Sequence, residues 1–237
     1  MVKQTVIVTG GTKGLGREIS LAFARAGRTV VALYSSDEIA AQRLNAELEA
    51  LKAPGAAVRH DVRSSDSAVW SRPEVQGADD LALIHNACAS FEPAPMHQLN
   101  WSDFETSLSV AVQGAWSCVQ PLLRLMVKKK RGAIVNILTS AIAGTPPKGF
   151  AAYVVAKHAL RGMTIALGAE FSARGVRVFS VSPGYMDTPL TQGWDVRLRE
   201  TVRAKSPRLT APSVAARRIL ELVTSSEIPA AGEDYPI

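Results

Sequence analysis

Two side chains four residues apart, Tyr153 and Lys157, could together carry acid–base chemistry. They fall in a stretch with helical periodicity, so both would project from one face of a helix. An unperturbed phenol has a pKa of about 10, too high for efficient proton transfer at neutral pH. A nearby ammonium group stabilises the phenolate and would bring that pKa toward the working range. Ser140, just past the end of an expected strand, could hydrogen-bond a substrate carbonyl.

A glycine-rich loop, Thr9–Gly16, follows the first expected strand and opens the first expected helix. Glycines allow a tight turn and a close approach to a pyrophosphate, and the helix N-terminus offers free N–H groups. The spacing is G-x-x-x-G-x-G rather than G-x-G-x-x-G, but its place between a strand and a helix indicates a dinucleotide site. The residues expected to bind the dinucleotide here are Gly10, Thr12, Lys13, Gly14, Leu15 and Gly16.

The end of the second expected strand indicates which dinucleotide binds. An acidic residue there would bind the ribose 2′-hydroxyl of NAD and repel the 2′-phosphate of NADP. The chain instead has Ser35 and Ser36, with Asp37 one step further on, where it can cap the next helix. Neutral hydroxyls together with Lys13 predict NADPH rather than NADH. The alternative makes Lys13 a surface lysine and Asp37 the ribose ligand.

Short apolar runs alternate with longer amphipathic runs along the whole chain, which predicts a parallel sheet covered by helices on both faces. The expected strands are Thr5–Thr9, Thr29–Tyr34, Ala56–His60, Leu81–His85, Ala133–Leu138, Val176–Val181 and Glu233–Pro236. The expected helices are Leu15–Ala26, Asp37–Lys52, Ser65–Val75, Ser102–Lys129, Gly149–Ala173, Pro189–Ala204 and Ala211–Thr224. The fold class is therefore α/β, a single doubly wound Rossmann domain of three layers spanning residues 1–237. Residues 188–209 are the expected substrate lid.

Composition narrows the class of protein. Hydrophobic residues make up 47% and charged residues 20% of the chain, an ordinary globular balance. Two cysteines form no motif, and four histidines show no metal spacing, so no metal site is expected. No signal peptide and no membrane-length apolar stretch are found, which predicts a cytoplasmic protein. The charge of +6 is dispersed, which favours a solvated surface, then an anionic substrate or acidic carrier protein, with nucleic acid a distant third.

Further short motifs follow in a recognisable order: Asp61-Val62, then His85-Asn86-Ala87-Cys88, then Ser182-Pro183-Gly184 with Thr188. With the glycine loop and the Tyr153–Lys157 pair, they make nearly the whole chain resemble the short-chain dehydrogenase/reductase family.

The resemblance implies hydride transfer between a nicotinamide and a carbonyl. Tyr153 would protonate the carbonyl oxygen, Lys157 would hold the nicotinamide ribose and tune Tyr153, and Ser140 would orient the carbonyl. The further residues that the resemblance implies at the cofactor are Asp61, Val62, Asn86, Ala87, Pro183, Gly184, Met186 and Thr188.

Three positions depart from the family pattern. Ala111 stands where the family has a catalytic asparagine, and Cys88 replaces a glycine beside the cofactor cleft. The strand before the serine has one extra residue, so Thr139 competes with Ser140 for the hydroxyl position. Ser140 is preferred because its spacing to Tyr153 is the commoner one in the family.

The favoured substrate is a 3-oxoacyl thioester, because the chain resembles 3-oxoacyl-[acyl-carrier-protein] reductases. In those enzymes basic residues beside the cleft meet the acidic carrier, and the corresponding positions here are Lys130 and Arg174. The alternative functions are a reductase of free small ketones or quinones, a biosynthetic secondary-alcohol dehydrogenase, or an NADP-binding scaffold with weakened catalysis. The resemblance also implies a homodimer or homotetramer.

Overall fold

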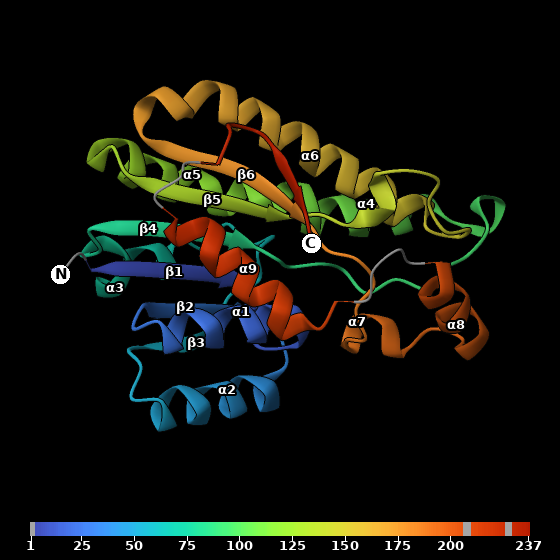
Figure 1. Ribbon diagram of the computed structural model, residues 1–237, viewed down its shortest axis with the longest axis horizontal. Coiled ribbons are helices and arrows are strands. Elements are labelled where there is room, and N and C mark those ends of the chain that lie inside the picture. The colour runs from blue at the N-terminus through green and yellow to red at the C-terminus, as the bar shows by residue number, and fades with distance from the viewer. Residues whose placement is uncertain (1–2, 206–209, 226–228) are drawn as a thin grey trace.

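Across residues 3–205, 210–225 and 229–237, which the structure describes, seven parallel strands form the central sheet of the computed structural model (Figure 1). The strands are β1 (Gln4–Thr9), β2 (Thr29–Tyr34), β3 (Gly55–Arg59), β4 (Asp80–His85), β5 (Gly132–Ile137), β6 (Val176–Ser182) and β7 (Asp234–Pro236). Their order is β3-β2-β1-β4-β5-β6-β7. The order reverses between β1 and β4, where a doubly wound sheet opens a crevice at the carboxyl ends of its strands. The predicted fold class is confirmed.

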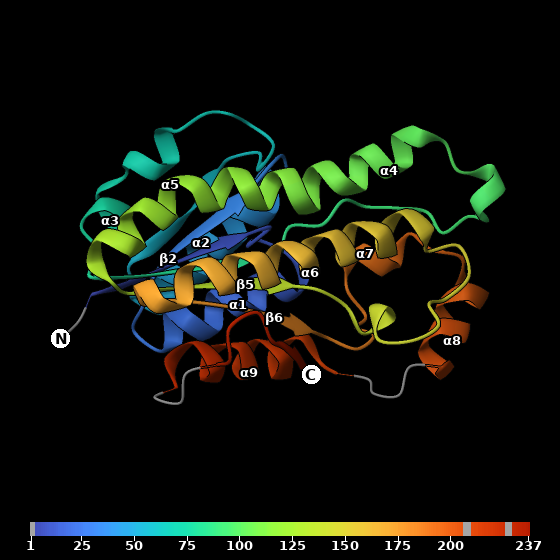
Figure 2. The same ribbon diagram turned by 90° about the horizontal axis from the view of Figure 1, so that it is seen from above.

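Helices cover both faces of this sheet. One face carries α1 (Gly14–Arg25), α2 (Glu38–Ala50) and α9 (Pro212–Thr224). The other carries α3 (Pro73–Gln76), α5 (Gly114–Lys129) and α6 (Ala151–Phe171). Figure 2 shows α5 and α9 on opposite sides of the strands. No helix among the described residues is both long and apolar enough to cross a membrane.

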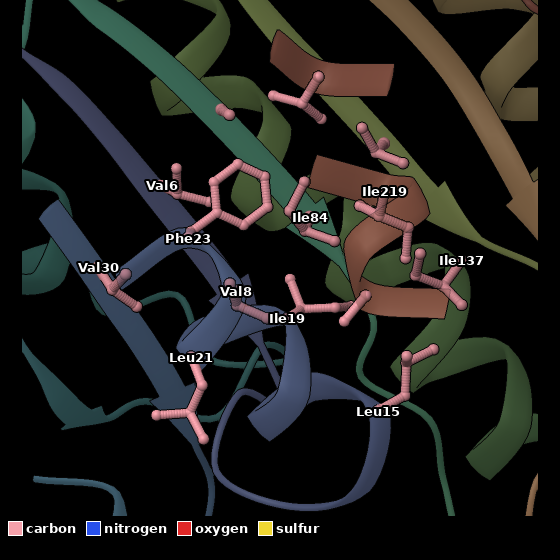
Figure 3. Packing of buried hydrophobic residues seen from close by; sticks show 14 of the residues in the cluster. Val6, Val8, Leu15, Ile19, Leu21, Phe23, Val30, Ile84, Ile137 and Ile219 are labelled. Atoms are coloured by element: carbon pink, nitrogen blue, oxygen red, sulfur yellow. The ribbon is translucent and has the colours of Figure 1, made fainter. Parts of the chain in front are cut away.

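Helix α1 fixes the position of the glycine loop that precedes it. Its apolar side chains, among them Ile19 and Phe23, are fully buried between the strands and α9 (Figure 3). Burying such a side chain contributes roughly 1.5–3 kcal/mol. The helix therefore holds its N-terminus in a defined place at the carboxyl end of β1.

The prediction of one helix over Ser65–Val75 was wrong. The chain forms a short 3-10 turn at Ala68–Ser71 and then α3. Pro73 has no N–H and disfavours a helical conformation in the residue before it. Arg72 is accordingly extended, with φ −61° and ψ 142°, so the helix cannot continue through it.

Two long predicted helices are interrupted. The helix expected over Ser102–Lys129 consists of α4 (Trp101–Leu108), a wider π turn at Ser109–Gln113, and α5. The helix expected over Pro189–Ala204 is split into α7 (Pro189–Gln192) and α8 (Val196–Lys205).

The break before α8 has a local cause. The Asp195 carboxylate accepts hydrogen bonds from the N–H groups of Arg197 and Leu198, which starts a new helix there. Both α7 and α8 lie beyond the carboxyl ends of the strands (Figure 1), where a lid would lie. The last four residues of the expected lid, 206–209, are outside the described residues.

Candidate active site

A cavity of about 940 Å³ opens at the carboxyl ends of the strands. Nearly every residue that the sequence assigned to a cofactor or a reaction lines it; Gly16 does not. A Cβ on Gly16 would lie 2.0 Å from the carbonyl oxygen of Gly10, so this glycine serves the close packing of the loop on its own helix. The structure thus gathers the predicted residues from one end of the chain to the other around one cavity.

The glycine loop has the shape of a phosphate cradle. Gly10 and Gly14 have φ values of +60° and +51°, which residues with a Cβ rarely adopt. Asn86 donates from Nδ2 to the carbonyl oxygens of Thr9 (3.1 Å) and Gly10 (3.2 Å) and so pins the loop to β4. Helix α1 has no acidic residue in its first turn and no side-chain cap at Lys13, so its first N–H groups are available to an anion. These features fit a dinucleotide pyrophosphate.

The far end of the cavity carries paired charges. Lys13 Nζ lies 2.9 Å from Asp37 Oδ2. Asp37 also accepts from the N–H of Ala40 at the start of α2, and these two contacts hold the pKa of its carboxyl below its usual range. Asp61 is bound by the guanidinium and N–H of Arg63. Ser35 and Ser36 are exposed on the same wall.

Tyr153 and Lys157 lie together in the first turns of α6. The Lys157 ammonium is 5.8 Å from the centre of the Tyr153 ring and donates to the carbonyl oxygen of Ile137 at 2.6 Å. Burial raises the pKa of Tyr153, Cys88 raises it further, and a hydrogen bond with the Thr139 side chain opposes them. Burial also lowers the pKa of Lys157. The pKa lowering that the sequence predicted for the phenol is therefore not found, because burial is the largest effect on it.

Two neighbouring hydroxyls compete for the substrate carbonyl. Thr139 and Ser140 both line the cavity, and Thr139 is the one whose side chain lowers the pKa of Tyr153. Ser140 begins a short turn, and its N–H donates to the carbonyl of Pro183. The preference for Ser140 stays a prediction from its spacing, whereas the contact with the phenol supports Thr139.

Two aromatic side chains that the sequence left out of the site contact Tyr153: Phe91 in the loop after β4 and Phe150 before α6. Trp194, between α7 and α8, which the sequence allowed as a core or substrate-cleft residue, contacts both of them and lines the cavity. The ring of Phe91 stacks on that of Tyr153, with centroids 4.7 Å apart and planes 13° from parallel. Phe91 and Trp194 lie in loops, where the apolar periodicity of the sequence gives no information about which side chains face a cavity. The signal that could have indicated them as site residues is the presence of a large aromatic residue in a loop.

Lys130 and Arg174 do not lie beside the cleft. Lys130 ends α5 just before β5, and Arg174 comes just before β6. Both therefore lie at the amino edge of a parallel sheet whose cavity is at the carboxyl edge, one strand length or about 20 Å away. The expectation that they lie beside this chain's cleft was wrong. Among the residues that the structure describes, no three His, Cys, Asp or Glu side chains gather as metal ligands would.

A family model described as short chain dehydrogenase matches residues 4–198, which include the glycine loop, the tyrosine and the lysine. The chain belongs to the short-chain dehydrogenases. It is accordingly an oxidoreductase of the type that acts on alcohol and ketone groups, which confirms the resemblance in the sequence.

Similar proteins span several substrates. This short-chain dehydrogenase is 29% identical to a cis-4-hydroxycyclohexanecarboxylate dehydrogenase of Sinomonas cyclohexanicum, over 94% of this chain and 90% of that protein. It is 29% identical to a 3-oxoacyl-[acyl-carrier-protein] reductase of Synechocystis, over 81% of this chain and 78% of that protein. A solved structure of a putative NAD(P)-dependent gluconate 5-dehydrogenase from Beutenbergia cavernae, with bound NADP, matches with a TM-score of 0.86 at 25% identity, over 100% of this chain and 95% of that one.

Proposed function

We propose that this short-chain dehydrogenase interconverts a ketone and a secondary alcohol with NADPH as its cofactor, and that Tyr153 moves the proton. The observation that carries the proposal is the meeting of Tyr153, Lys157 and the Thr139 hydroxyl in a cavity that also holds a phosphate cradle. Ser35, Ser36 and Lys13 support NADPH over NADH, because neutral and cationic groups accept a 2′-phosphate.

In the reductive direction each residue has a separate task. NADPH, when bound, supplies the hydride that the carbonyl carbon accepts. The raised pKa of Tyr153 keeps the phenol protonated at neutral pH, and its Oη donates that proton to the carbonyl oxygen. The hydroxyl of Thr139, or that of Ser140, hydrogen-bonds the same oxygen and orients it. The Lys157 ammonium stabilises the phenolate that remains after the transfer.

The test is Tyr153→Phe, with NADPH oxidation followed on a panel of ketones. Loss of the general acid should lower kcat by about 10²–10⁴-fold. The phenol supplies little of the cofactor's binding energy, so NADPH binding followed by fluorescence should survive. A Phe variant with near-full turnover would overturn the mechanism.

A carrier-linked 3-oxoacyl thioester is the second candidate, supported by the similarity to the Synechocystis reductase. Its test is Lys130→Glu combined with Arg174→Glu. Selective loss of activity on a carrier-bound chain, with a free small thioester spared, supports a carrier that reaches these residues. Equal retention on both substrates rejects it, as the position of the two residues away from the cleft suggests.

A further inference from the structure

We infer that the substrate carries a flat apolar ring at or beside its reacting carbonyl, so that its class is cyclic and aryl ketones or the corresponding alcohols. The inference rests on the proposed function and concerns the same cavity. It is carried by the three rings of Phe91, Phe150 and Trp194, named here the aromatic wall.

The aromatic wall lies directly against the reacting group. Phe91 covers one face of the Tyr153 ring, and Phe150 meets the same ring edge-on at 6.1 Å. A carbonyl that accepts a hydrogen bond from Tyr153 Oη lies about 2.7 Å from that oxygen. Because the Phe91 ring is stacked 4.7 Å from the Tyr153 ring, the first substituents on the carbonyl carbon come within reach of Phe91. A flat apolar group there would stack on the ring or meet its edge.

The wall is held rigidly. Phe91, Phe150 and Trp194 contact one another edge-to-face, with centroids 5.1–5.3 Å apart. Phe150 and Trp194 are 5% and 7% exposed, and the indole N–H of Trp194 donates to the carbonyl oxygen of Phe91 at 3.1 Å. The segment between α7 and α8 therefore fixes the Phe91 backbone. Phe91 presents a preformed surface to a ligand and has little freedom to move aside.

The surroundings of the wall disfavour a polyhydroxylated substrate. The segments that carry the rings also give Pro146, Pro147 and Leu190 to the cavity, and their one charged contribution among the described lining residues is the exposed Lys148. Their polar contributions are the hydroxyls of Ser90, Thr145 and Thr191. Substrate hydroxyl groups placed directly against the three rings would lose their water there without gaining partners from the rings. Each such loss should weaken binding roughly tenfold or more.

The experiment compares 2-tetralone with the small ketone acetone and the polyhydroxylated ketone D-fructose, in the parent enzyme and in Phe91→Ala and Phe91→Leu. For 2-tetralone, Phe91→Ala should lower kcat/KM about tenfold or more, mainly through KM. Phe91→Leu should give a kcat/KM between those of the parent and Phe91→Ala. Acetone shares any loss that comes from the altered surroundings of Tyr153, so the ratio of kcat/KM for 2-tetralone to kcat/KM for acetone should fall about tenfold in Phe91→Ala and less in Phe91→Leu. Comparing variants cancels the intrinsic reactivity of each ketone.

Trp101→Ala is the matched control, because Trp101 is an exposed ring stacked on Phe104 outside the cavity lining. Trp101→Ala should leave the kcat/KM for each of the three ketones at the parent's value. Equal losses on 2-tetralone and acetone, or a parent enzyme that prefers D-fructose to 2-tetralone, would overturn the inference while the proposed function stands. If the parent reduces no ketone, open-chain or cyclic, the proposed function itself fails.

Discussion

The imidazole of His85 donates from Nε2 to the main-chain carbonyl of Ala111, 3.1 Å away, in the fully buried region beneath the cleft. The proton position follows from the other ring nitrogen. Thr9 Oγ1 accepts the N–H groups of Asn86 and Ala87, so its own proton goes to His85 Nδ1. Nε2 therefore carries the imidazole proton.

The residue that accepts this bond is one of those that depart from the family pattern. Ala111 lies in the π turn, whose backbone hydrogen bonds join residues five apart instead of four. His85 takes the Ala111 carbonyl as its acceptor. His85 thus links Thr9, at the end of β1, to Ala111, the buried residue of the π turn.

The first prediction concerns stability in acid. Burial lowers the pKa of His85 to about 3, against an ordinary value of 6.5. Below pH 6.5 the unfolded chain therefore binds a proton at His85, whereas the folded chain does not. The stability that neutral His85 contributes to the fold is fully present above pH 6.5 and is lost as the pH falls toward 3. Between pH 7 and pH 5 the free energy of unfolding should drop by about 2 kcal/mol from this group, as measured by urea unfolding.

His85→Asn is the control for this loss. Asparagine does not titrate, so the variant should lose less stability between pH 7 and pH 5 than the parent. His60, whose pKa burial also lowers, contributes in the same direction in both proteins and cancels. Identical pH dependence in parent and variant would show that His85 is not the group responsible.

The second prediction concerns cofactor choice. Lys13 is paired with Asp37, so a 2′-phosphate must compete with that carboxylate for the ammonium. Asp37→Asn frees the lysine and keeps a good helix cap, because asparagine caps as well as aspartate. The ratio of NADPH to NADH in kcat/KM should rise about tenfold with little change in melting temperature, whereas Lys13→Ala should lower it about tenfold or more. If Asp37→Asn instead weakens NADH binding alone, Asp37 is a ribose ligand.

The third prediction concerns the pH dependence of turnover. A proton donor must be protonated, and burial raises the pKa of Tyr153 above its ordinary value. The kcat for ketone reduction should therefore stay level from about pH 6 to about pH 9, and alcohol oxidation should rise over the same range, because it needs the phenolate. A reductive rate that falls by half near pH 7 would instead show that Lys157 lowers the phenol pKa once the cofactor is bound, as the sequence predicted.

Much of the fold could be predicted because its signals are local. All seven strands were expected close to their observed positions, since continuous apolar runs mark strands buried on both faces. The break at Ser109–Gln113 was missed, because a π turn keeps the apolar periodicity of the helix around it. The carbonyl of Ala111 in this turn contacts His85, which lies 26 residues away in the sequence.

The candidate site was only partly predictable for a related reason. Residues in motifs, such as Tyr153, line the cavity as expected. The aromatic wall depends on Phe91 and Trp194 being brought together, and they are 103 residues apart. The expected position of Lys130 was wrong because a helix that leads into a parallel strand ends at the amino edge of the sheet, away from the cleft.

The last prediction separates the two hydroxyls beside the catalytic tyrosine. The Thr139 side chain lies close enough to the phenol to lower the pKa of Tyr153, and its oxygen is held in place by the N–H of Ala141 at 3.3 Å. Ser140 has the spacing to Tyr153 that is common in the family, and its N–H is fixed by Pro183. A hydroxyl that orients the carbonyl stabilises charge developing on its oxygen, and removing such a donor costs about 10²–10³-fold in kcat. Thr139→Val should therefore lower kcat by that amount, Thr139→Ser should restore most of it, and Ser140→Ala should stay within about tenfold of the parent. The opposite order, a large loss in Ser140→Ala with Thr139→Val nearly active, would assign the carbonyl to Ser140 and leave Thr139 as the cap of the turn alone.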